Sequence, residues 1–283
     1  MANTEQILKM CDIPAVPMVA MKILRLVEEE NINVDALQDV IMADQSLAAR
    51  VLKMANSSFY GLRRNIDTVS EAIIMMGFNT IKNLALAVST KDVYKKFGLL
   101  EQKLWEHSIG VSVAAGLLAQ AIRFPSAEEA TVAGLLHDVG KVVMNNSQPE
   151  RFSLLTEMVY NDRVMFIDRE KDMFGFGHAE VGGIFALRWG FSGHLSDAIR
   201  RHHFEAFDDL LELEPSTRNL CCIIALADAI CIRLGVGYRG PMADLNLRDR
   251  EYMELLEIGE KEFSDLIERF KQAYVEEKIS YQM

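Results

Sequence analysis

All six histidines of the 283-residue chain fall between positions 107 and 203. At two places a histidine is followed directly by another potential metal ligand. His137 is followed directly by Asp138, and His202 by His203. Imidazole nitrogens and carboxylate oxygens together are typical ligands of divalent Mn, Fe, Ni, Zn or Mg ions. A metal ion held in this way can activate water for attack on phosphorus. Metal-dependent chemistry is therefore the first hypothesis for this segment.

A second carboxylate stands out because it interrupts an apolar run. Asp228 lies within Ile-Ala-Leu-Ala-Asp-Ala-Ile, residues 224–230. A carboxylate on so apolar a helix is costly to bury unless it meets a cation or hydrogen-bond donors. The alternative is that Asp228 lies on a single solvent-facing stripe of that helix.

Three further residues carry weaker signals. His107 and His178 each lie on or beside a predicted helix, where a histidine is more commonly a satisfied core residue than a ligand. Lys141 comes three residues after Asp138. It could contact a phosphate as a point charge, or it could be an ordinary cation near a helix end.

The last histidines differ in what their positions predict. His202 and His203 point about 100° apart on one helix, so both can face one site only if the site is wide, as a two-ion site is. Otherwise one is a ligand and the other is structural. His194 follows Ser192-Gly193 and is predicted to be a loop residue outside the site.

The elements that would position these residues are helices almost everywhere, because no run alternates with period two. In the first 90 residues the pattern predicts five or six short helices. Asp44 is a predicted N-cap, Thr68 and Glu71 have capping-box spacing, and Gly77 is placed to end a helix. Asn79 is predicted to cap the helix that follows.

From residue 104 onward the predicted helices are longer and more apolar, and a charged, amphipathic tail follows them. Their predicted ranges are 105–122, 127–144, 150–160, 178–189, 196–203 and 216–234. The composition changes near residues 100 and 240. We therefore expect three parts: an N-terminal helical subdomain over 1–100, a helical core with the metal site over 101–240, and a helical tail over 241–283.

Composition and charge narrow the function classes. Half of the residues are apolar and a quarter are charged, as in globular domains, and the net charge is -11. Neutralising nucleic-acid phosphates calls for the opposite sign, so no nucleic acid is expected as a partner. The alternative is a helix-turn-helix around residues 77–79, but few basic residues lie in its second helix.

The sequence also predicts a compartment. No stretch is long and apolar enough for a transmembrane helix, and the first residues show no signal-peptide pattern. The cysteines have no CxxC spacing; they are Cys11, Cys221, Cys222 and Cys231. We therefore expect a cytoplasmic protein with free thiols and no membrane partner.

Two sets of motifs resemble known families. Residues 136–141 (LHDVGK) resemble the signature of the HD superfamily of metal-dependent phosphohydrolases. The N-terminal half resembles a narrower group, the HDOD (HD-related output domain) family. The motifs that carry this second resemblance are IPAVP at 13–17, DQSL at 44–47, ANSSFY at 55–60, and the segment from Ala72-Ile73 to Gly77.

The HDOD resemblance implies an all-α fold, in which an N-terminal helical subdomain accompanies an HD-like helical core. It also implies bacterial signalling, often as the output of a response regulator, with a sensor kinase or receiver protein as partner and a nucleotide as a further ligand. Many members have lost the metal ligands and are non-catalytic. This chain keeps the full set in the order of the dinuclear branch, which implies a site for one or two ions. Its members are His107, His137, Asp138, His178, His202, His203 and Asp228. Independently of the resemblance, the amphipathic tail is expected to pack on its own core, the alternative being the seam of a homodimer.

Two functions follow from these observations. The first is a regulatory output domain that binds a protein or nucleotide and holds a divalent metal. Residues 57–64 are a candidate contact loop, unless Phe59 and Tyr60 are buried in the N-terminal bundle. The alternative is a metal-dependent phosphohydrolase or phosphodiesterase, with Asp138 and Lys141 as catalytic residues. The chain lacks the Asp-Gly-x-Gly-Tyr-Pro run of the HD-GYP phosphodiesterases, so hydrolysis of cyclic dinucleotides does not follow.

Overall fold

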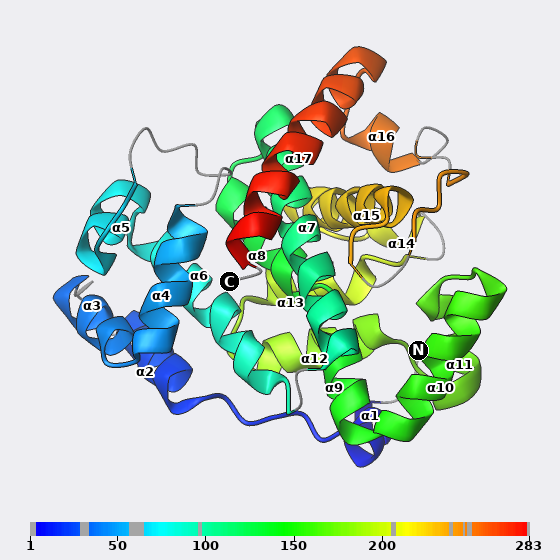
Figure 1. Cartoon of the computed structure of the whole chain (residues 1–283), viewed down its shortest axis with the longest axis horizontal. Helices are drawn as coiled ribbons and strands as arrows, with labels where there is room; N and C mark the ends of the chain where they lie inside the picture. Colours follow the sequence, from blue (N-terminus) through cyan, green and yellow to red (C-terminus); the bar gives the residue numbers. More distant parts are fainter. Residues whose placement is uncertain are drawn as a thin grey trace. The chain divides into compact units, whose positions relative to one another are not determined.

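The computed structural model describes residues 4–28, 34–56, 65–95, 98–204, 208–237, 240–245, 247 and 251–281. In these ranges the regular elements are helices and no strand occurs, which confirms the all-α prediction (Figure 1). The chain divides into two compact units. We call residues 1–15 and 93–267 the site unit, and residues 16–92 and 268–283 the N-terminal unit. The predicted contact loop at 57–64 lies outside the described residues.

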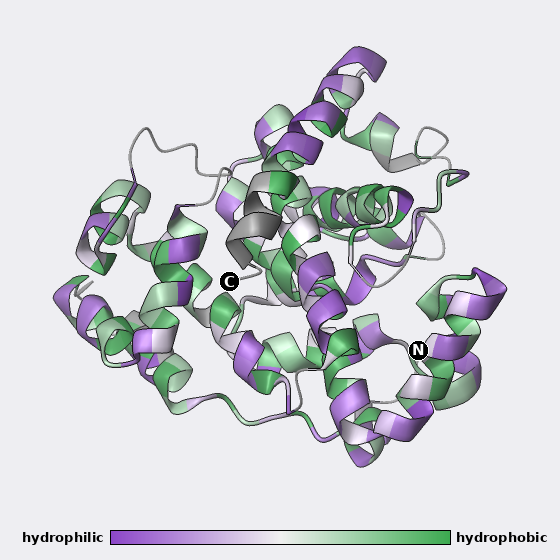
Figure 2. Ribbon diagram, in the orientation of Figure 1, coloured by the Kyte–Doolittle hydropathy of each residue, from purple (hydrophilic) through white to green (hydrophobic). Residues whose placement is uncertain are grey.

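The N-terminal unit is built from short amphipathic helices, whose polar and apolar faces alternate in Figure 2. They are α2 (Met18–Glu28), α3 (Val34–Met42), α4 (Gln45–Ala55), α5 (Val69–Met76) and α6 (Phe78–Ser89), and a short 3-10 helix, η1 (Thr90–Val93), follows. Their inward faces form a core of fully buried aliphatic side chains, among them Ile23, Leu37, Ile41, Leu47 and Ile81. Burial of these side chains is what stabilises helices too short to persist alone.

The helix ends of this unit follow the sequence pattern with one exception. The side chain of Asp44 accepts a hydrogen bond from Leu47 N, and that of Thr68 accepts one from the backbone N–H three residues on, so both predicted caps are confirmed. Gly77 ends α5 as predicted. The prediction that Asn79 caps the next helix is wrong, because α6 already begins at Phe78. Gly77, with φ of +89°, turns the chain directly from one helix into the next.

The site unit contains longer helices. They are α1 (Thr4–Met10), α7 (Leu99–Ala121), α8 (Ala127–Leu136), α9 (Val139–Ser147), α10 (Pro149–Asp162), α11 (Phe166–Phe174), α12 (His178–Arg188), α13 (Gly193–Arg201), α14 (Asp208–Leu211), α15 (Pro215–Leu234) and α16 (Glu251–Leu255). Helix α7 packs against α8 and α15, and α12 packs against α9 and α13. The boundary between the units falls inside α17 (Glu260–Tyr281).

One predicted helix is broken where the sequence pattern runs on. The range 127–144 forms two helices, α8 and α9, with His137 and Asp138 between them. The imidazole Nδ1 of His137 lies 2.7 Å from the carbonyl oxygen of Gly134, which is the acceptor that another turn of α8 would use. The imidazole of His137 thus bonds to the last turn of α8 at the point where this helix ends.

Two findings concern the predictions about membrane-spanning helices and about the cysteines. Across the described residues, no helix combines the length and the apolar character that crossing a bilayer requires. The four cysteines are free and buried, as predicted for an apolar setting. Burial raises the pKa of Cys221 and of Cys222 to about 12, so neither thiol is a ready nucleophile.

Candidate metal centre

The predicted ligands come from five places in the site unit and are brought together in its interior. His107 lies on α7, His137 and Asp138 at the junction of α8 and α9, His178 at the start of α12, His202 and His203 directly after α13, and Asp228 on α15. All but His203 are buried. The side chain of His203 is 16% exposed.

Asp138 lies between two sets of imidazoles. Its Oδ1 is 3.2 Å from His178 Nε2 and 4.0 Å from His202 Nε2. Its Oδ2 is 3.4 Å from His137 Nε2 and 3.7 Å from His107 Nε2. The two oxygens of one carboxylate therefore face two different histidine pairs, which is how a carboxylate bridges two ions.

Asp228 closes the other side of the cluster. Its Oδ1 lies 2.9 Å from His107 Nε2 and 3.8 Å from His137 Nε2, and its Oδ2 lies 3.9 Å from His203 Nε2. The residue is only 4% exposed. The alternative of a solvent-facing stripe is therefore wrong, and the apolar context of Asp228 does indicate a buried, partnered carboxylate.

Four of the histidines are oriented in the same way, with Nδ1 bound to an outer acceptor and Nε2 directed inward. The outer acceptors are Val236 O for His107 at 3.0 Å, Gly134 O for His137 at 2.7 Å, Ile199 O for His202 at 2.6 Å, and Glu170 Oε2 for His178 at 2.6 Å. A carbonyl or carboxylate oxygen accepts hydrogen bonds, so Nδ1 carries the proton in each ring. In the neutral form the lone pair is then on Nε2, as metal coordination requires.

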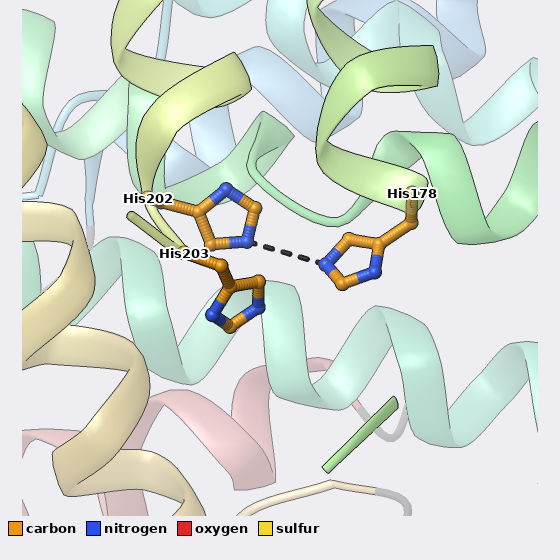
Figure 3. A group of neighbouring side chains, drawn as sticks. All are labelled: His178, His202 and His203. Atoms are coloured by element: carbon orange, nitrogen blue, oxygen red, sulfur yellow. Dashed lines mark hydrogen bonds between the residues drawn. The ribbon is translucent and has the colours of Figure 1, made fainter. Parts of the chain in front are cut away.

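The donor atoms form two compact groups. His178, His202 and His203 make up the first, which we call the three-histidine group; His107, His137 and Asp138 make up the second, which we call the His-His-Asp group. In each group the ligand atoms lie within 4.8 Å of one another. Figure 3 shows the first group, in which the Nε2 atoms of His178 and His202 are 3.3 Å apart.

The buried carboxylates stay ionised in this setting. Burial would by itself raise the pKa of Asp138, but His137 and Lys141 hold it well below its ordinary value. Burial also opposes ionisation of Asp228, and the hydrogen bond and charge of His107 outweigh it, so that the pKa of Asp228 is lowered as well. Both groups are therefore anionic at neutral pH, which favours a cation between them.

The histidines of the three-histidine group do not titrate alike. Burial lowers the pKa of His202 well below its ordinary value, with repulsion from His203 adding to it. Burial and the charge of His178 lower the pKa of His203 to about 3. His178 differs: burial would lower its pKa, but the adjacent carboxylate of Glu170 raises it. At neutral pH two of the three rings are neutral ligands.

Glu170 is the site residue that the sequence analysis missed. It lies on α11, is fully buried, and accepts hydrogen bonds from both the backbone N–H and Nδ1 of His178. In the sequence it belongs to the charged run at 168–172, which is typical of a solvent-facing helix. A signal was present nonetheless, because Glu170 is four residues from Phe166 and four from Phe174 and so shares their buried face.

Lys141 is buried beside the carboxylate of Asp138. Its Nζ donates a hydrogen bond to Asp138 Oδ2 at 2.7 Å, and the side chain is 3% exposed. The ammonium also lies 4.7 Å from the ring centroid of Phe166, within range of a cation–π contact. These contacts place Lys141 against Asp138; contact with a phosphate stays a prediction.

His194 lies apart from the cluster. The prediction of a loop residue is wrong, because α13 begins at Gly193. Its Nδ1 lies 2.7 Å from Thr217 Oγ1, and its Nε2 lies 3.4 Å from Glu129 Oε2. The Ser192 side chain caps the helix by accepting from Leu195 N, so Ser192-Gly193 starts a helix here rather than a loop.

A close approach of two helices supports the position of His178. Gly140 lies in the first turn of α9, and a Cβ at this position would be 1.9 Å from the carbonyl oxygen of His178. Only a residue without a side chain allows α9 and α12 to pack this closely. The Gly-Lys pair after Asp138 thus has two roles: Gly140 admits the backbone of α12, and Lys141 contacts the carboxylate.

The residues fit a divalent metal ion. Within the described part of the chain, His137 Nε2 and Asp138 Oδ1 are buried and have no hydrogen-bond partner. Buried polar atoms normally have a hydrogen-bond partner. These two atoms therefore require a ligand from outside the protein. Bonds of about 2.0–2.2 Å to a shared ion leave neighbouring ligand atoms roughly 3–3.5 Å apart, which is close to the separations within the cluster.

The fold and the cluster define an all-helical protein of the HD type. The HDOD domain family matches residues 13–204, which is more than half of the chain. The chain therefore belongs to the HDOD family, and the resemblance seen in its motifs is confirmed.

Two curated proteins are similar to parts of this chain. An uncharacterized protein of Treponema pallidum is 28% identical over 197 residues, which are 68% of this chain and 38% of that protein. The uncharacterized protein YuxH of Bacillus subtilis is 33% identical over 75 residues, 26% of this chain and 18% of YuxH. The chain therefore spans well under half the length of these relatives.

Solved structures agree over nearly the whole chain. An HDOD domain protein of unknown function from Geobacter sulfurreducens has a TM-score of 0.79 and 26% identity, over 99% of this chain and 97% of that one. A protein from Shewanella amazonensis SB2B, named as a candidate phosphohydrolase, has a TM-score of 0.71 and 23% identity, over 98% of each chain. The second likeness shows the shared fold.

Proposed function

We propose that this HDOD protein is a cytoplasmic regulatory protein of bacterial signal transduction whose site unit holds one or two divalent metal ions (Mn, Fe, Ni, Zn or Mg). The observation that carries the proposal is the Asp138 carboxylate between two groups of inward-directed imidazoles. The three-histidine group would hold one ion and the His-His-Asp group, with Asp228, the other. Asp138 would bridge them, since each of its oxygens faces one group.

A bound ion would couple the helices of the site unit. The donors belong to α7, the α8–α9 junction, α12, the residues directly after α13, and α15, so the ions of the two groups would together join segments that are far apart in the chain. Metal binding then becomes folding free energy for this part of the molecule. A regulatory protein of this kind would present one surface when loaded and a looser one when empty.

The N-terminal unit offers a surface for a signalling partner such as a sensor kinase or a receiver protein. Large apolar side chains are exposed on its helices; among them are Met18, Met21, Met42, Ile74 and Met75. Methionine-rich surfaces adapt to different partners because the side chain is flexible and polarisable. A nucleotide is the proposed ligand of the site unit, since its phosphates would meet the bound metal ions, and a homodimer formed through the amphipathic C-terminal tail is a further proposed assembly.

A second candidate function is a metal-dependent phosphohydrolase. It is favoured by the completeness of the donor set and by the partial exposure of His203, which leaves one side of the cluster open to solvent. A divalent ion bound there would supply Lewis-acid activation of a phosphoryl group. Asp138 would keep the metal-binding atoms of the histidines in position. Lys141, which is paired with Asp138, would contribute positive charge at the phosphate oxygens.

The metal content of the full chain tests the proposal. The protein is purified without a metal-affinity tag and its metals are counted by elemental mass spectrometry, beside Asp138→Ala and the control Asp172→Ala, an exposed aspartate on α11. We expect one or two equivalents in the wild type and the control, and less than about a tenth of this in Asp138→Ala. Absence of metal in the wild type, even after reloading with each ion, would contradict the site.

The same samples separate the two candidate functions. The metal-loaded wild type is incubated with bis-p-nitrophenyl phosphate, a generic phosphodiester. Turnover that Asp138→Ala abolishes while the variant stays folded would establish the phosphohydrolase. No turnover by the fully loaded protein would favour the regulatory function, and an equal rate in Asp138→Ala would refute the catalytic role of this residue.

A further inference from the structure

The outer partners of the inward-directed histidines are not equivalent. His107, His137 and His202 each donate Nδ1–H to a backbone carbonyl, whereas His178 donates to the carboxylate of Glu170. A carbonyl fixes the ring orientation and adds only a dipole. A carboxylate fixes the ring and adds a full negative charge to the side of the imidazole opposite Nε2.

Glu170 is held firmly in this position. It lies between Phe166 and Phe174 on the buried face of α11 and is 0% exposed. Its Oε2 accepts the backbone N–H of His178 at 2.8 Å and Nδ1 of the same residue at 2.6 Å. The ring is therefore fixed both at its nitrogen and at the backbone that carries it.

Among the described residues, His178 is the one group that forms an ion pair with the Glu170 carboxylate. The Oε1 atom of Glu170 is buried without a hydrogen bond. In the described part of the chain, both hydrogen bonds to its Oε2 come from His178. Burying a carboxylate is costly unless a cation lies near. A metal ion bound to Nε2 of His178 would be such a cation, because its charge would act on the carboxylate through the imidazole ring between them.

We propose that Glu170 is a positioning residue that strengthens ion binding at the three-histidine group and leaves the His-His-Asp group unaffected. This inference rests on the proposed metal site. Glu170 hydrogen-bonds to His178, which belongs to the first group, and within the ranges that the structure describes no hydrogen bond or ion pair joins it to His107 or His137. Loss of such an outer partner typically weakens metal binding about 10–100-fold.

The test is a titration of the metal-stripped full chain with Co²⁺, comparing the wild type with Glu170→Gln. Glutamine keeps the size of the side chain and an oxygen that can accept from His178, and removes the charge. We expect one equivalent of Co²⁺ to bind about 10–100-fold more weakly in Glu170→Gln, and its visible absorption bands to shift. The other equivalent is expected to keep its wild-type affinity and spectrum.

A matched control is Glu180→Gln. Glu180 lies at the same helix start, where its Oε2 accepts a hydrogen bond from Gly177 N at 3.0 Å. It lies two residues from His178, and this hydrogen bond is made to the backbone. We expect both equivalents of Co²⁺ to bind to this variant as they do to the wild type.

The outcomes separate this inference from the proposed function. Failure of the wild type to bind Co²⁺ would overturn both. Wild-type affinities in Glu170→Gln would overturn the role of Glu170 and leave the metal site standing. Equal weakening of both equivalents, together with a lower melting temperature of the stripped variant, would also overturn it, because Glu170 would then act on the fold as a whole.

Discussion

The N-terminal unit and the site unit are both built on buried aliphatic side chains, but their cores differ in charge. In the described part of the N-terminal unit, the buried polar side chains are Ser89 and Thr90, whose hydroxyls bond to carbonyls of the same helical segment. The site unit buries acids, bases and imidazoles together; they are Glu106, His107, His137, Asp138, Lys141, Glu170, His178, His202 and Asp228.

This difference separates packing from function. Each buried charge costs free energy that a hydrophobic residue of similar volume would not, and buried ion pairs are weak evidence of stability. A core that concentrates ionisable groups is therefore explained by what it binds. The N-terminal unit has the core of a structural scaffold, and the site unit has the core of a ligand-binding domain.

The largest expected effect comes from a cavity in the N-terminal unit. Leu47 is fully buried, so Leu47→Ala is expected to lower the free energy of unfolding by about 2–5 kcal/mol, through lost burial and an unfilled cavity. Because its core holds no described metal ligand, the metal content of the folded protein is expected to stay at the wild-type value. Denaturant unfolding and elemental analysis measure the two quantities.

A matched deletion in the other unit completes this test. Leu118 on α7 is also fully buried, and Leu118→Ala is expected to lower the free energy of unfolding by a similar amount. A loss of metal from folded Leu47→Ala would break the distinction between the units, because it would mean that packing in the N-terminal unit supports the site.

A smaller effect on stability is expected at Gly140, where α9 and α12 approach each other closely. In Gly140→Ala the new Cβ would overlap the His178 carbonyl oxygen, so α9 and α12 must separate. We expect a loss of about 1–3 kcal/mol in stability and weaker metal retention, because His137, Asp138 and His178 move apart. Thermal unfolding and metal content would be measured together.

Gly193→Ala is the control for added side-chain volume. A Cβ at Gly193 has no atom within 4 Å, and its backbone φ is not positive. This variant is expected to stay within about 0.5 kcal/mol of the wild type. Equal behaviour of the two glycine variants would refute the claim that close packing of α9 on α12 positions the ligands.

The sequence allowed much of this fold to be predicted, because the relevant signals are local. Capping at Asp44 and Thr68 and the turn at Gly77 depend on residues within four positions of one another. The convergence of the candidate ligands could also be predicted, since these histidines and aspartates stand at motif positions. These features need no knowledge of how distant segments meet.

The features that were missed depend on tertiary contacts. Glu170 lies in a charged run and is buried because α11 packs its face inward against the site. At the break between α8 and α9 the His137 side chain bonds to a backbone carbonyl, a contact that an apolar periodicity does not record. Propensity and periodicity therefore predict elements, and three-dimensional contacts decide which polar residues serve the site.

The pH dependence of the metal-free protein sharpens the comparison further. The pKa values of His202 and His203 lie below 6.5 in the folded state, about 3 for His203, so the unfolded chain binds more protons as the pH falls below about 6.5. The site unit should then lose up to about 1.4 kcal/mol per histidine for each pH unit. The raised pKa of His178 acts above this window, where its stabilising contribution is lost as pH rises.

The two units are expected to respond differently to acid. The N-terminal unit contains no histidine, so its stability should change little between pH 7 and pH 5. Hydrogen exchange on chelator-treated protein reports the two units separately. Equal loss of protection in α4 and in α12 would mean that the units unfold together, and no loss in α12 would contradict the lowered pKa values.

The smallest effect is expected at a helix cap of the N-terminal unit. Thr68 Oγ1 accepts a hydrogen bond from Glu71 N at 3.1 Å, and Thr68→Ala leaves this N–H to solvent. We expect a loss of about 1 kcal/mol, and Thr68→Ser should restore most of it, because serine supplies the same acceptor. Metal content should be unchanged in both variants, since the cap secures α5, which carries none of the ligands. A fall in metal content with this mild change would show that the metal site depends on the order of the N-terminal unit, and the separation of scaffold and site would then have to be given up.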